Sequence, residues 1–431
     1  MTPAPGPRAS ATNGGLQPGI DIVVPTIGRP SLAVLFEALA AQTQLPGRVV
    51  VVDDRRGGGP LAGVPPALTV RVVPSGGRGP AAARNAGWRA GTAEWVAFLD
   101  DDVVPPPEWF ATLIADLSRL PDEVAASQGG IRVPLPAGRR PTDWERNVAG
   151  LERARWATAD MAYRRRVLET VGGFDERFVR AYREDADLGL RVVGAGWRIE
   201  RGARRVTHPA RPADRWVSLR LQRGNADDML MRALHGPGWR AAAGVPEGRR
   251  RRHLAISAAG LVAVAAPPRT VRKLATAAWA FGTAELAWAR IRPGPRTATE
   301  VATMVATSVA MPWAAAWHTL AGAARWRAAR RPEVLPGGEQ LTLAPAAVLF
   351  DRDGTLVEDV PYNPDPSRVV PMPGAEEALR RLRAAGVATA VVSNQSGIGR
   401  GRLTPAEVEA VNARVQELLG PLGPVVVCPH A

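Results

Sequence analysis

An apolar run that ends abruptly in three aspartates, WVAFLDDDVVP at residues 95–105, constrains this chain more than any other stretch. The first five residues have the length and composition of a buried strand. Asp100, Asp101 and Asp102 cannot belong to a core, because burying unpaired charge is costly. Ligands bind at the carboxyl ends of strands in open α/β sheets. Asp100 and Asp102 can both face a hard cation, which prefers oxygen ligands. We predict a divalent-metal site that holds a diphosphate; the alternative is a solvated acidic turn.

The length of 431 residues exceeds one ordinary domain and predicts two or three. The apolar content of 46% is sufficient for sizeable cores. The single cysteine, Cys428, excludes an intrachain disulfide and therefore a stapled extracellular scaffold. Residues 1–18 are rich in Pro, Gly and Ala and show no secretory signal, so we expect a disordered tail.

The first domain, residues 19–240, alternates strand-like and helix-like segments, which predicts an α/β fold with a mostly parallel sheet. We expect strands at 21–25, 48–52, 68–73 and 95–99, and helices at 31–43 and 81–90. The second strand ends in Asp53 and Asp54, and the fourth ends in the three aspartates. Both acidic groups are therefore expected at the same edge of the sheet.

Six short motifs in this domain occur together and in a recognisable order. They are Pro25-Thr26, Asp53-Asp54, Ala83-Arg84-Asn85-Ala86-Gly87, Asp100-Asp101-Asp102, Gly172-Gly173-Phe174-Asp175-Glu176 and Arg183-Glu184-Asp185. Each motif alone is weak, but their combination over some 200 residues is specific. The domain resembles a family 2 glycosyltransferase with the GT-A (Rossmann-like) fold.

The resemblance implies a role for each group of residues. Asp100 and Asp102 would hold Mg²⁺ or Mn²⁺ against the diphosphate as a Lewis acid. Asp185 would be the general base that deprotonates an acceptor hydroxyl, so that one sugar is transferred with inversion. The N-terminus of a predicted helix from 185 to 193 would keep this carboxylate ionised. The nucleotide sugar would be bound by Pro25, Thr26, Asp53, Asp54, Arg84, Asn85 and Asp101.

Several of these assignments leave an alternative open. Gly173, Phe174 and Glu184 are expected on the acceptor side, but the first two can equally form a plain turn and a core aromatic. The pair Glu184 and Asp185 could be ordinary helix N-terminal charge. His208 is a candidate metal ligand, or a hydrogen-bonded structural histidine.

The charge of the chain is concentrated in its middle. The formal net charge is +14, and residues 240–332 alone hold 15 basic and three acidic residues. We expect residues 241–331 to form an Ala-, Arg- and Trp-rich helical segment, of which 249–331 lies at an anionic membrane surface. The alternatives are a membrane-spanning helix at 301–324, interrupted by Pro312, and a helical subdomain packed on the transferase. No motif supports nucleic-acid binding. The expected location is cytoplasmic, peripheral on the inner face of the membrane.

The last part of the chain follows a predicted linker at 332–344. Residues 345–431 hold a strand at 346–350 that ends in DRDGT, a strand at 386–392 that ends in SNQSG, and a capped helix at 405–419. With the motifs VED at 357–359, PYN at 361–363 and SGIGRG at 396–401, they resemble the haloacid dehalogenase (HAD) phosphatases. The similarity is to the branch of the D,D-heptose 1,7-bisphosphate and histidinol phosphate phosphatases.

This second resemblance also implies residue roles. Asp351 would be the nucleophile and Asp353 the acid/base, both helping to hold Mg²⁺. The phosphate would be bound by Thr355, Ser393, Asn394 and Arg400. The alternative for the DRDGT stretch is a calcium-like or structural turn. Cys428 and His430 look like half of a zinc loop, whereas a structural zinc site needs four ligands. We expect an incomplete phosphatase half, either truncated or completed by a second polypeptide, with an open sheet edge and doubtful activity.

Three functions follow. The preferred one is an inverting, metal-dependent glycosyltransferase fused to a partial phosphatase. Phosphatase activity as the main function, and a non-catalytic nucleotide-sugar-binding scaffold at the membrane, are the alternatives. Because the phosphatase branch makes a precursor of nucleotide-activated heptose, the fusion suggests such a heptose as the donor. The sequence does not name the sugar, the base or the acceptor.

Overall fold

The computed structural model describes residues 18–61, 63–329, 347–384 and 387–430. The predicted linker at 332–344, and the predicted tail except Pro18, lie outside these residues. The chain divides into two compact units, residues 1–337 and 338–431.

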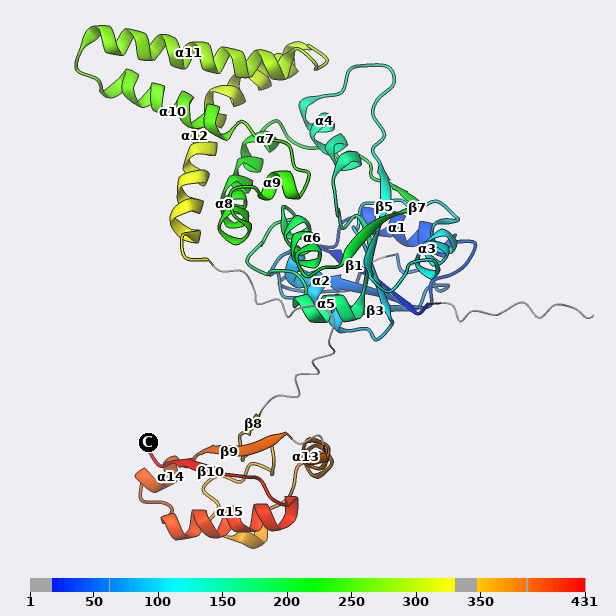
Figure 1. The fold of residues 1–431 in the computed structure, drawn as a ribbon, viewed down its shortest axis with the longest axis vertical. Helices are drawn as coiled ribbons and strands as arrows, with labels where there is room; N and C mark the ends of the chain where they lie inside the picture. Colours follow the sequence, from blue (N-terminus) through cyan, green and yellow to red (C-terminus); the bar gives the residue numbers. More distant parts are fainter. Residues whose placement is uncertain (1–17, 62, 330–346, 385–386, 431) are drawn as a thin grey trace, which may run out of the picture. The chain divides into compact units, whose positions relative to one another are not determined.

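The first unit is built on a seven-stranded sheet with the order β3-β2-β1-β4-β6-β5-β7 (Figure 1). β1, β2, β3 and β4 are parallel, β5 is parallel to β7, and β6 runs antiparallel between β4 and β5. The predicted α/β class with a mostly parallel sheet is therefore confirmed. The strands are β1 (Ile20–Thr26), β2 (Val49–Asp53), β3 (Val70–Pro74), β4 (Trp95–Leu99), β5 (Val124–Arg132), β6 (Asp160–Arg164) and β7 (Arg198–Thr207).

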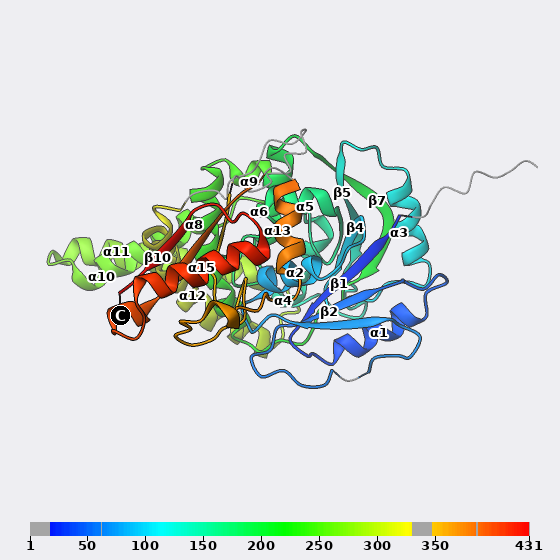
Figure 2. The ribbon, with the colours of Figure 1, turned by 90° about the horizontal axis from the view of Figure 1, so that it is seen from below.

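Helices cover both faces of this sheet, as Figures 1 and 2 show. α1 (Ser31–Ala40) and α3 (Trp109–Ser118) pack on one face, and α2 (Pro80–Arg89), α5 (Arg165–Val171) and α6 (Glu184–Gly194) pack on the other. Side chains alternate across a strand, so Ile22 and Val24 belong to the α1 side while Val23 belongs to the α2 side. The side chains of Ile22, Val23 and Val24 are all fully buried.

Short helices and a long helical segment complete the first unit. The shorter elements are α4 (Asp143–Ala149), the 3₁₀ turns η1 (Gly150–Arg153) and η2 (Leu221–Arg223), α7 (Val217–Arg220), α8 (Gly224–His235) and α9 (Trp239–Ala242). The helical segment consists of α10 (Arg250–Ala265), α11 (Arg269–Ile291) and α12 (Ala298–Trp326). α12 packs on α8 so closely that a Cβ atom at Gly322 would lie 2.6 Å from the Cα atom of Ala226.

The buried Arg290 connects this helical segment to the preceding domain. Its guanidinium donates hydrogen bonds to Asp143 on α4, to Ser218 on α7, and to Thr307 and Ser308 on α12. The helices are thus packed on the domain at 19–240, which is one of the three arrangements expected from the sequence. α12 continues through Pro312 rather than ending there. Among the described helices, none is long and apolar enough to cross a membrane.

The second unit holds a three-stranded parallel sheet with the order β10-β9-β8. Val391 on β9 packs with Leu379 and Val415 in the core on one face of this sheet. Leu349, Val392 and Val426 alternate with the core side chains and are exposed on the other face. The elements are β8 (Ala347–Phe350), η3 (Pro366–Arg368), α13 (Ala375–Ala384), β9 (Ala388–Asn394), α14 (Ser396–Gly399), α15 (Pro405–Leu419) and β10 (Val425–Cys428).

Candidate active site

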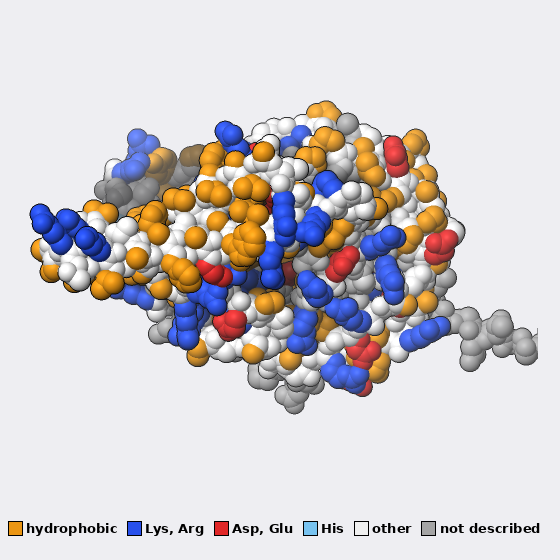
Figure 3. Space-filling view, turned by 90° about the horizontal axis from the view of Figure 1, so that it is seen from above, with side chains coloured by type: hydrophobic (Ala, Val, Ile, Leu, Met, Phe, Trp, Pro, Cys, Tyr) orange, Lys and Arg blue, Asp and Glu red, His pale blue; other side chains and the backbone are white. Residues whose placement is uncertain are grey.

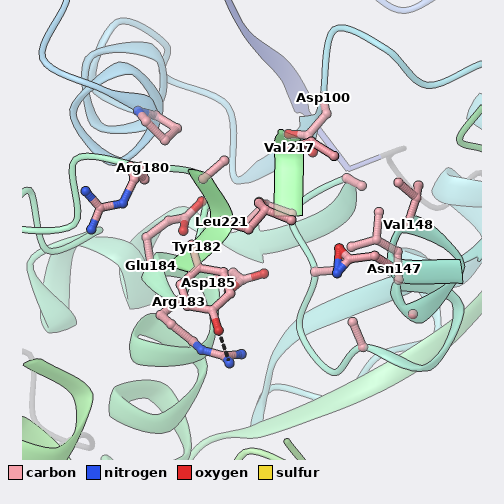
Figure 4. Close-up of a pocket in the computed structure, with 18 of the residues that line it drawn as sticks. Asp100, Asn147, Val148, Arg180, Tyr182, Arg183, Glu184, Asp185, Val217 and Leu221 are labelled. Atoms are coloured by element: carbon pink, nitrogen blue, oxygen red, sulfur yellow. Dashed lines mark hydrogen bonds between the residues drawn. The ribbon is translucent and has the colours of Figure 1, made fainter. Parts of the chain in front are cut away.

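A cleft of about 1860 Å³ opens at the carboxyl ends of β1, β2 and β4. Four carboxylates that the sequence singled out, those of Asp54, Asp100, Asp102 and Asp185, all line it. Helices α4, α7, α10 and α11 contribute the walls opposite the strand ends. The predicted convergence of separate acidic motifs in one place is therefore present in the fold. Figure 4 shows part of this lining, with Asp100 and the segment from Tyr182 to Asp185 in the same view.

Asp100, Asp102 and His208 form a cluster that suits a cation. One potential ligand atom from each lies within 4.8 Å of the others, and no other group of three or more such side chains occurs among the described residues. His208 reaches this position because the backbones of Val104 and Thr207 exchange two hydrogen bonds, which hold the end of β7 beside the turn after β4. The donors are oxygens and an imidazole nitrogen, which suit Mg²⁺ or Mn²⁺.

Two features of this cluster support a ligand role. The Nε2 atom of His208 faces Asp102 at 3.4 Å from Oδ1, and its Nδ1 atom is buried without a hydrogen-bond partner. Burial raises the pKa of Asp102, and the nearby Asp100 carboxylate raises it further, which a bound cation would reverse. The Asp102 carboxylate also pairs with Arg211, whose Nε atom lies 2.8 Å from Oδ2. Arg211 was not identified from the sequence, although it lies only three residues after His208.

The third aspartate of the motif has a different position. Asp101 is buried, and its two oxygens accept hydrogen bonds from Thr26 Oγ1 at 2.6 Å and from Arg29 Nη1 at 2.8 Å. Thr26 Oγ1 in turn accepts a hydrogen bond from the Gly28 backbone. Asp101 thereby fixes the end of β1, with Pro25 and Thr26, and the loop that follows it at the cleft. Its carboxylate is used within the protein rather than left free for a ligand.

The two aspartates at the end of β2, Asp53 and Asp54, make different contacts. Asp53 is held by the guanidinium of Arg55, which lowers the pKa of the Asp53 carboxyl, and it does not line the cleft. Asp54 does line the cleft. Its carboxylate accepts hydrogen bonds from Ser75 Oγ and from the backbone N–H groups of Arg78 and Gly79, which fixes the loop before α2.

Arg84 lies beneath the cation cluster, almost fully buried. It donates one hydrogen bond to Asp100 Oδ1 and another to Glu184 Oε1, both at 2.8 Å. Despite burial, these two carboxylates raise the pKa of Arg84 above its usual value, so the guanidinium stays charged. The residue thus joins the end of β4 to the start of α6.

Glu184 and Asp185 begin α6 at the floor of the cleft. Burial raises the pKa of Glu184 to about 7, although the ion pair with Arg84 acts in the opposite direction. Burial also raises the pKa of Asp185, against the hydrogen bond from the backbone of Ala186. The helix N-terminus was expected to favour the charged form of Asp185, but burial has the larger effect and raises the pKa of this carboxyl.

The residue before this pair has a strained backbone. Arg183 has φ 79°, the left-handed region that costs a non-glycine residue energy and is concentrated at functional sites. Its guanidinium donates to Asp228 Oδ1 and to the hydroxyl of Tyr182, the latter drawn as a dashed line in Figure 4. The sequence motif included Arg183 but gave it no role, since backbone strain has no signature in the residue types.

Three predicted residues lie behind the cleft rather than in it. The Asn85 side chain binds both the N–H and the carbonyl of Phe174, and Gly173 at φ 71° touches Asn85. Phe174 is a core residue that packs edge-to-face on Phe98, with ring centroids 5.3 Å apart. None of the three lines the cleft, and Phe174 lies in the core, which was the alternative named for it.

In the second unit, Gln395 joins the ends of β8 and β9. Its Nε2 atom donates to Asp353 Oδ2 at 2.7 Å and to Ser393 Oγ at 2.8 Å. Asp353 is also held by Arg352, while Asp351 is exposed. Two of the predicted side chains, those of Asp353 and Ser393, are thus brought together.

The remaining predicted residues of this unit lie around that point. Thr355 and Asn394 are exposed, and Arg400 donates to the Tyr362 hydroxyl. Cys428 and His430 lie 3.9 Å apart, from Sγ to Nδ1. They supply two potential zinc ligands.

Comparison with known proteins agrees with both parts of this description. Residues 21–187 match the family model of glycosyl transferase family 2. A stretch of 88 residues is 40% identical to the D-glycero-beta-D-manno-heptose-1,7-bisphosphate 7-phosphatase of Pseudomonas aeruginosa, covering 19% of this chain and 49% of that protein. The phosphatase of the same name from Mesorhizobium japonicum is 44% identical over 73 residues, which are 17% of this chain and 34% of that protein. The chain thus spans about half the length, or less, of these curated relatives.

Among solved structures, S. aureus TarS 1–349 in complex with UDP is similar to this chain. It is 17% identical, with a TM-score of 0.36, over 63% of this chain and 91% of that one.

Proposed function

We propose that the first unit, whose residues 21–187 form a family 2 glycosyltransferase domain, transfers one sugar from a nucleotide sugar to an acceptor hydroxyl with inversion. The observation that carries this proposal is the meeting of Asp100, Asp102 and His208 in the same cleft as Asp185. A cation cluster beside a half-buried carboxylate with a raised pKa is the arrangement that diphosphate departure and proton removal both need.

In this proposal Asp100, Asp102 and His208 would hold Mg²⁺ or Mn²⁺. Bound there, the ion would neutralise charge on the departing nucleoside diphosphate as a Lewis acid. Asp185 accepts the proton of the acceptor hydroxyl as its oxygen forms the new bond to the anomeric carbon. The bond between that carbon and the diphosphate oxygen breaks on the opposite side, which inverts the configuration.

The lining of the cleft supports a position for the donor. Thr26 and Asp54 lie at the ends of β1 and β2, beside the cation cluster, and would border the nucleotide. Asp101 positions Thr26, and Arg84 positions Asp100, each through a hydrogen bond. Glu184, which faces the same cleft, would contribute to the acceptor side.

The test is a panel of nucleotide sugars assayed for release of nucleoside diphosphate with Mn²⁺ or Mg²⁺. The panel includes a nucleotide-activated heptose, since fusion to a heptose phosphatase-like segment suggests that donor. Turnover should disappear in Asp102→Ala and Asp185→Ala and persist in Asp122→Ala, which removes an exposed carboxylate elsewhere. Unchanged turnover in the first two variants would refute the assignment. Use of a common hexose donor alone would remove the basis for heptose.

The second unit favours a further candidate, the handling of a phosphomonoester at the ends of β8 and β9. The supporting observation is that Gln395 brings Asp353 to Ser393. Asp351 would take the phosphoryl group as nucleophile and Asp353 would protonate the leaving alcohol; both would help to hold Mg²⁺, which would neutralise charge on the phosphoryl group. Hydrolysis of a heptose bisphosphate by the full chain, lost in Asp351→Asn, is the corresponding assay.

A further inference from the structure

The helical segment carries a row of exposed apolar side chains on α11. Leu274, Phe281 and Trp288 are 68%, 77% and 60% exposed. They are seven residues apart, so they lie on one face of the helix. A second exposed row runs along α12, from Val305 and Val309 to Trp317 and Leu320. Such rows are unusual on a helix that is already packed on a domain through its other face.

The two rows are joined into one surface. Trp288 and Ile291 of α11 and Val305 and Val309 of α12 line a single shallow apolar groove of about 410 Å³. The apolar surface of α11 therefore continues onto α12. We call the exposed rows and this groove the apolar face of the helical segment. Contiguous apolar surfaces of this kind mark sites of protein or membrane association.

Basic side chains lie at one end of this surface, where α10 turns into α11. Arg269, Arg272 and Lys273 are all exposed there. Val264, at 85% exposed, lies at the end of α10 beside the same turn. Figure 3 shows patches of hydrophobic side chains along the helical segment, with Lys and Arg gathered at its end. By contrast, Arg249 and Arg252 at the other end of the hairpin pair with Glu285.

We propose that the apolar face and this basic turn together bind the surface of an anionic lipid bilayer, with α11 and α12 lying in the plane of the interface. No described helix is suited to crossing a membrane, so insertion stays shallow. Tryptophan at the rim and unpaired cations at the end are the two side-chain types that the interface of an anionic leaflet favours. This inference is independent of the proposed transfer reaction.

Flotation of the full chain with vesicles of phosphatidylcholine, with and without phosphatidylglycerol, tests the proposal. We expect binding to the anionic vesicles only, reduced when salt rises from about 0.1 M to about 1 M and the Debye length falls to about 3 Å. The variant R269Q/R272Q/K273Q should bind about a hundredfold more weakly, since each charge near the surface contributes a factor of about five. The variant L274Q/F281Q should also lose binding, through its apolar contacts.

The matched control is R119Q/R201Q/R205Q, which removes the same charge from exposed positions directly after α3 and within β7. It should float like the unchanged chain. Circular dichroism and donor turnover establish that each variant is folded. Absence of flotation by the unchanged chain, or an equal loss in the control variant, would overturn the proposal. So would a dimer in sedimentation that L274Q/F281Q dissociates, because a second copy would then cover the apolar face.

Discussion

The guanidinium of Arg84 lies 2.8 Å from the Asp100 carboxylate, directly under the proposed cation site. A second hydrogen bond of the same length binds it to Glu184. One buried positive charge therefore sets the relative position of two acidic motifs that are far apart in the sequence. Removing it would leave Glu184 buried beside Asp185 without compensation.

Replacing Arg84 by Met is expected to destabilise the first unit by about 3–5 kcal/mol, the cost of breaking a buried ion pair from one side. Thermal and denaturant unfolding measure the change. Arg119→Met, at an exposed site, should cost less than about 1 kcal/mol. Equal stability of the two variants would show that the buried pair contributes little.

Removing a proposed cation ligand should weaken both metal binding and turnover. In Asp102→Asn we expect Mn²⁺ affinity to fall by at least about a hundredfold, since second-shell changes alone cost 10–100-fold. Electron paramagnetic resonance of free Mn²⁺ measures binding without relying on activity. His208→Ala should show a smaller loss in the same titration. If Mn²⁺ binds Asp102→Asn as tightly as the unchanged chain, the ion is held elsewhere.

Replacing Asp185 by Asn should lower the transfer rate by about 10²–10⁴-fold, the usual contribution of a general base. The donor should still bind, because Asp185 is not among the proposed cation ligands. Steady-state rates together with calorimetric donor binding separate the two effects. The same variant serves as its own check, since loss of donor binding would assign Asp185 to the donor side instead.

The pH dependence of transfer follows from the burial of this acidic pair. A general base acts only when deprotonated, so a raised pKa moves the loss of activity on acidification to higher pH. Burial raises the pKa of Asp185, and it raises the pKa of the neighbouring Glu184 to about 7. The loss of transfer activity on acidification should therefore occur above the ordinary aspartate pKa of about 3.9. Transfer rates measured from about pH 4 to about pH 9 at constant ionic strength test this expectation. A flat profile down to about pH 4 would contradict it.

The turn at Gly172 and Gly173 offers a matched pair of substitutions. Both residues have positive φ, but a Cβ atom has open space at Gly172 and would lie 2.5 Å from Asn85 Oδ1 at Gly173. Gly172→Ala should cost about 1 kcal/mol through backbone strain. Gly173→Ala should cost a further 1–3 kcal/mol or so from overpacking. Denaturant unfolding of the two variants gives the difference directly.

The strand ends show how much of this site the sequence could predict. A run of apolar residues followed by aspartates is a local signal, and the strand at 95–99 has the predicted bounds. The strands predicted at 21–25, 48–52 and 68–73 differ by one or two residues at their ends from β1, β2 and β3, whereas β5, β6 and β7 were not predicted. The helix at 405–419 is as predicted, with its Thr404–Glu407 capping box. Parallel topology then requires the acidic strand ends to meet, so their shared cleft was also predictable.

What the sequence did not predict depends on the direction in which a side chain leaves the backbone and on contacts between residues far apart in the chain. Asp53 is bound by Arg55, whereas Asp54 faces the cleft. This difference depends on the direction in which each side chain points at the end of the strand. The core position of Phe174 depends on Phe98, and the raised pKa of Asp185 depends on how much protein covers α6. None of these contacts can be predicted from a local sequence pattern. Arg211 reaches Asp102 only through the loop after β7.

Arg290 has a practical consequence for anyone who shortens this chain. A shortened chain that ends at residue 240 would lack Arg290, whose guanidinium binds both Asp143 and Ser218. It would also lack one side of the cleft that Asp185 lines. Expression of the minimal catalytic piece should therefore extend through α12, to about the end of the first compact unit at residue 337.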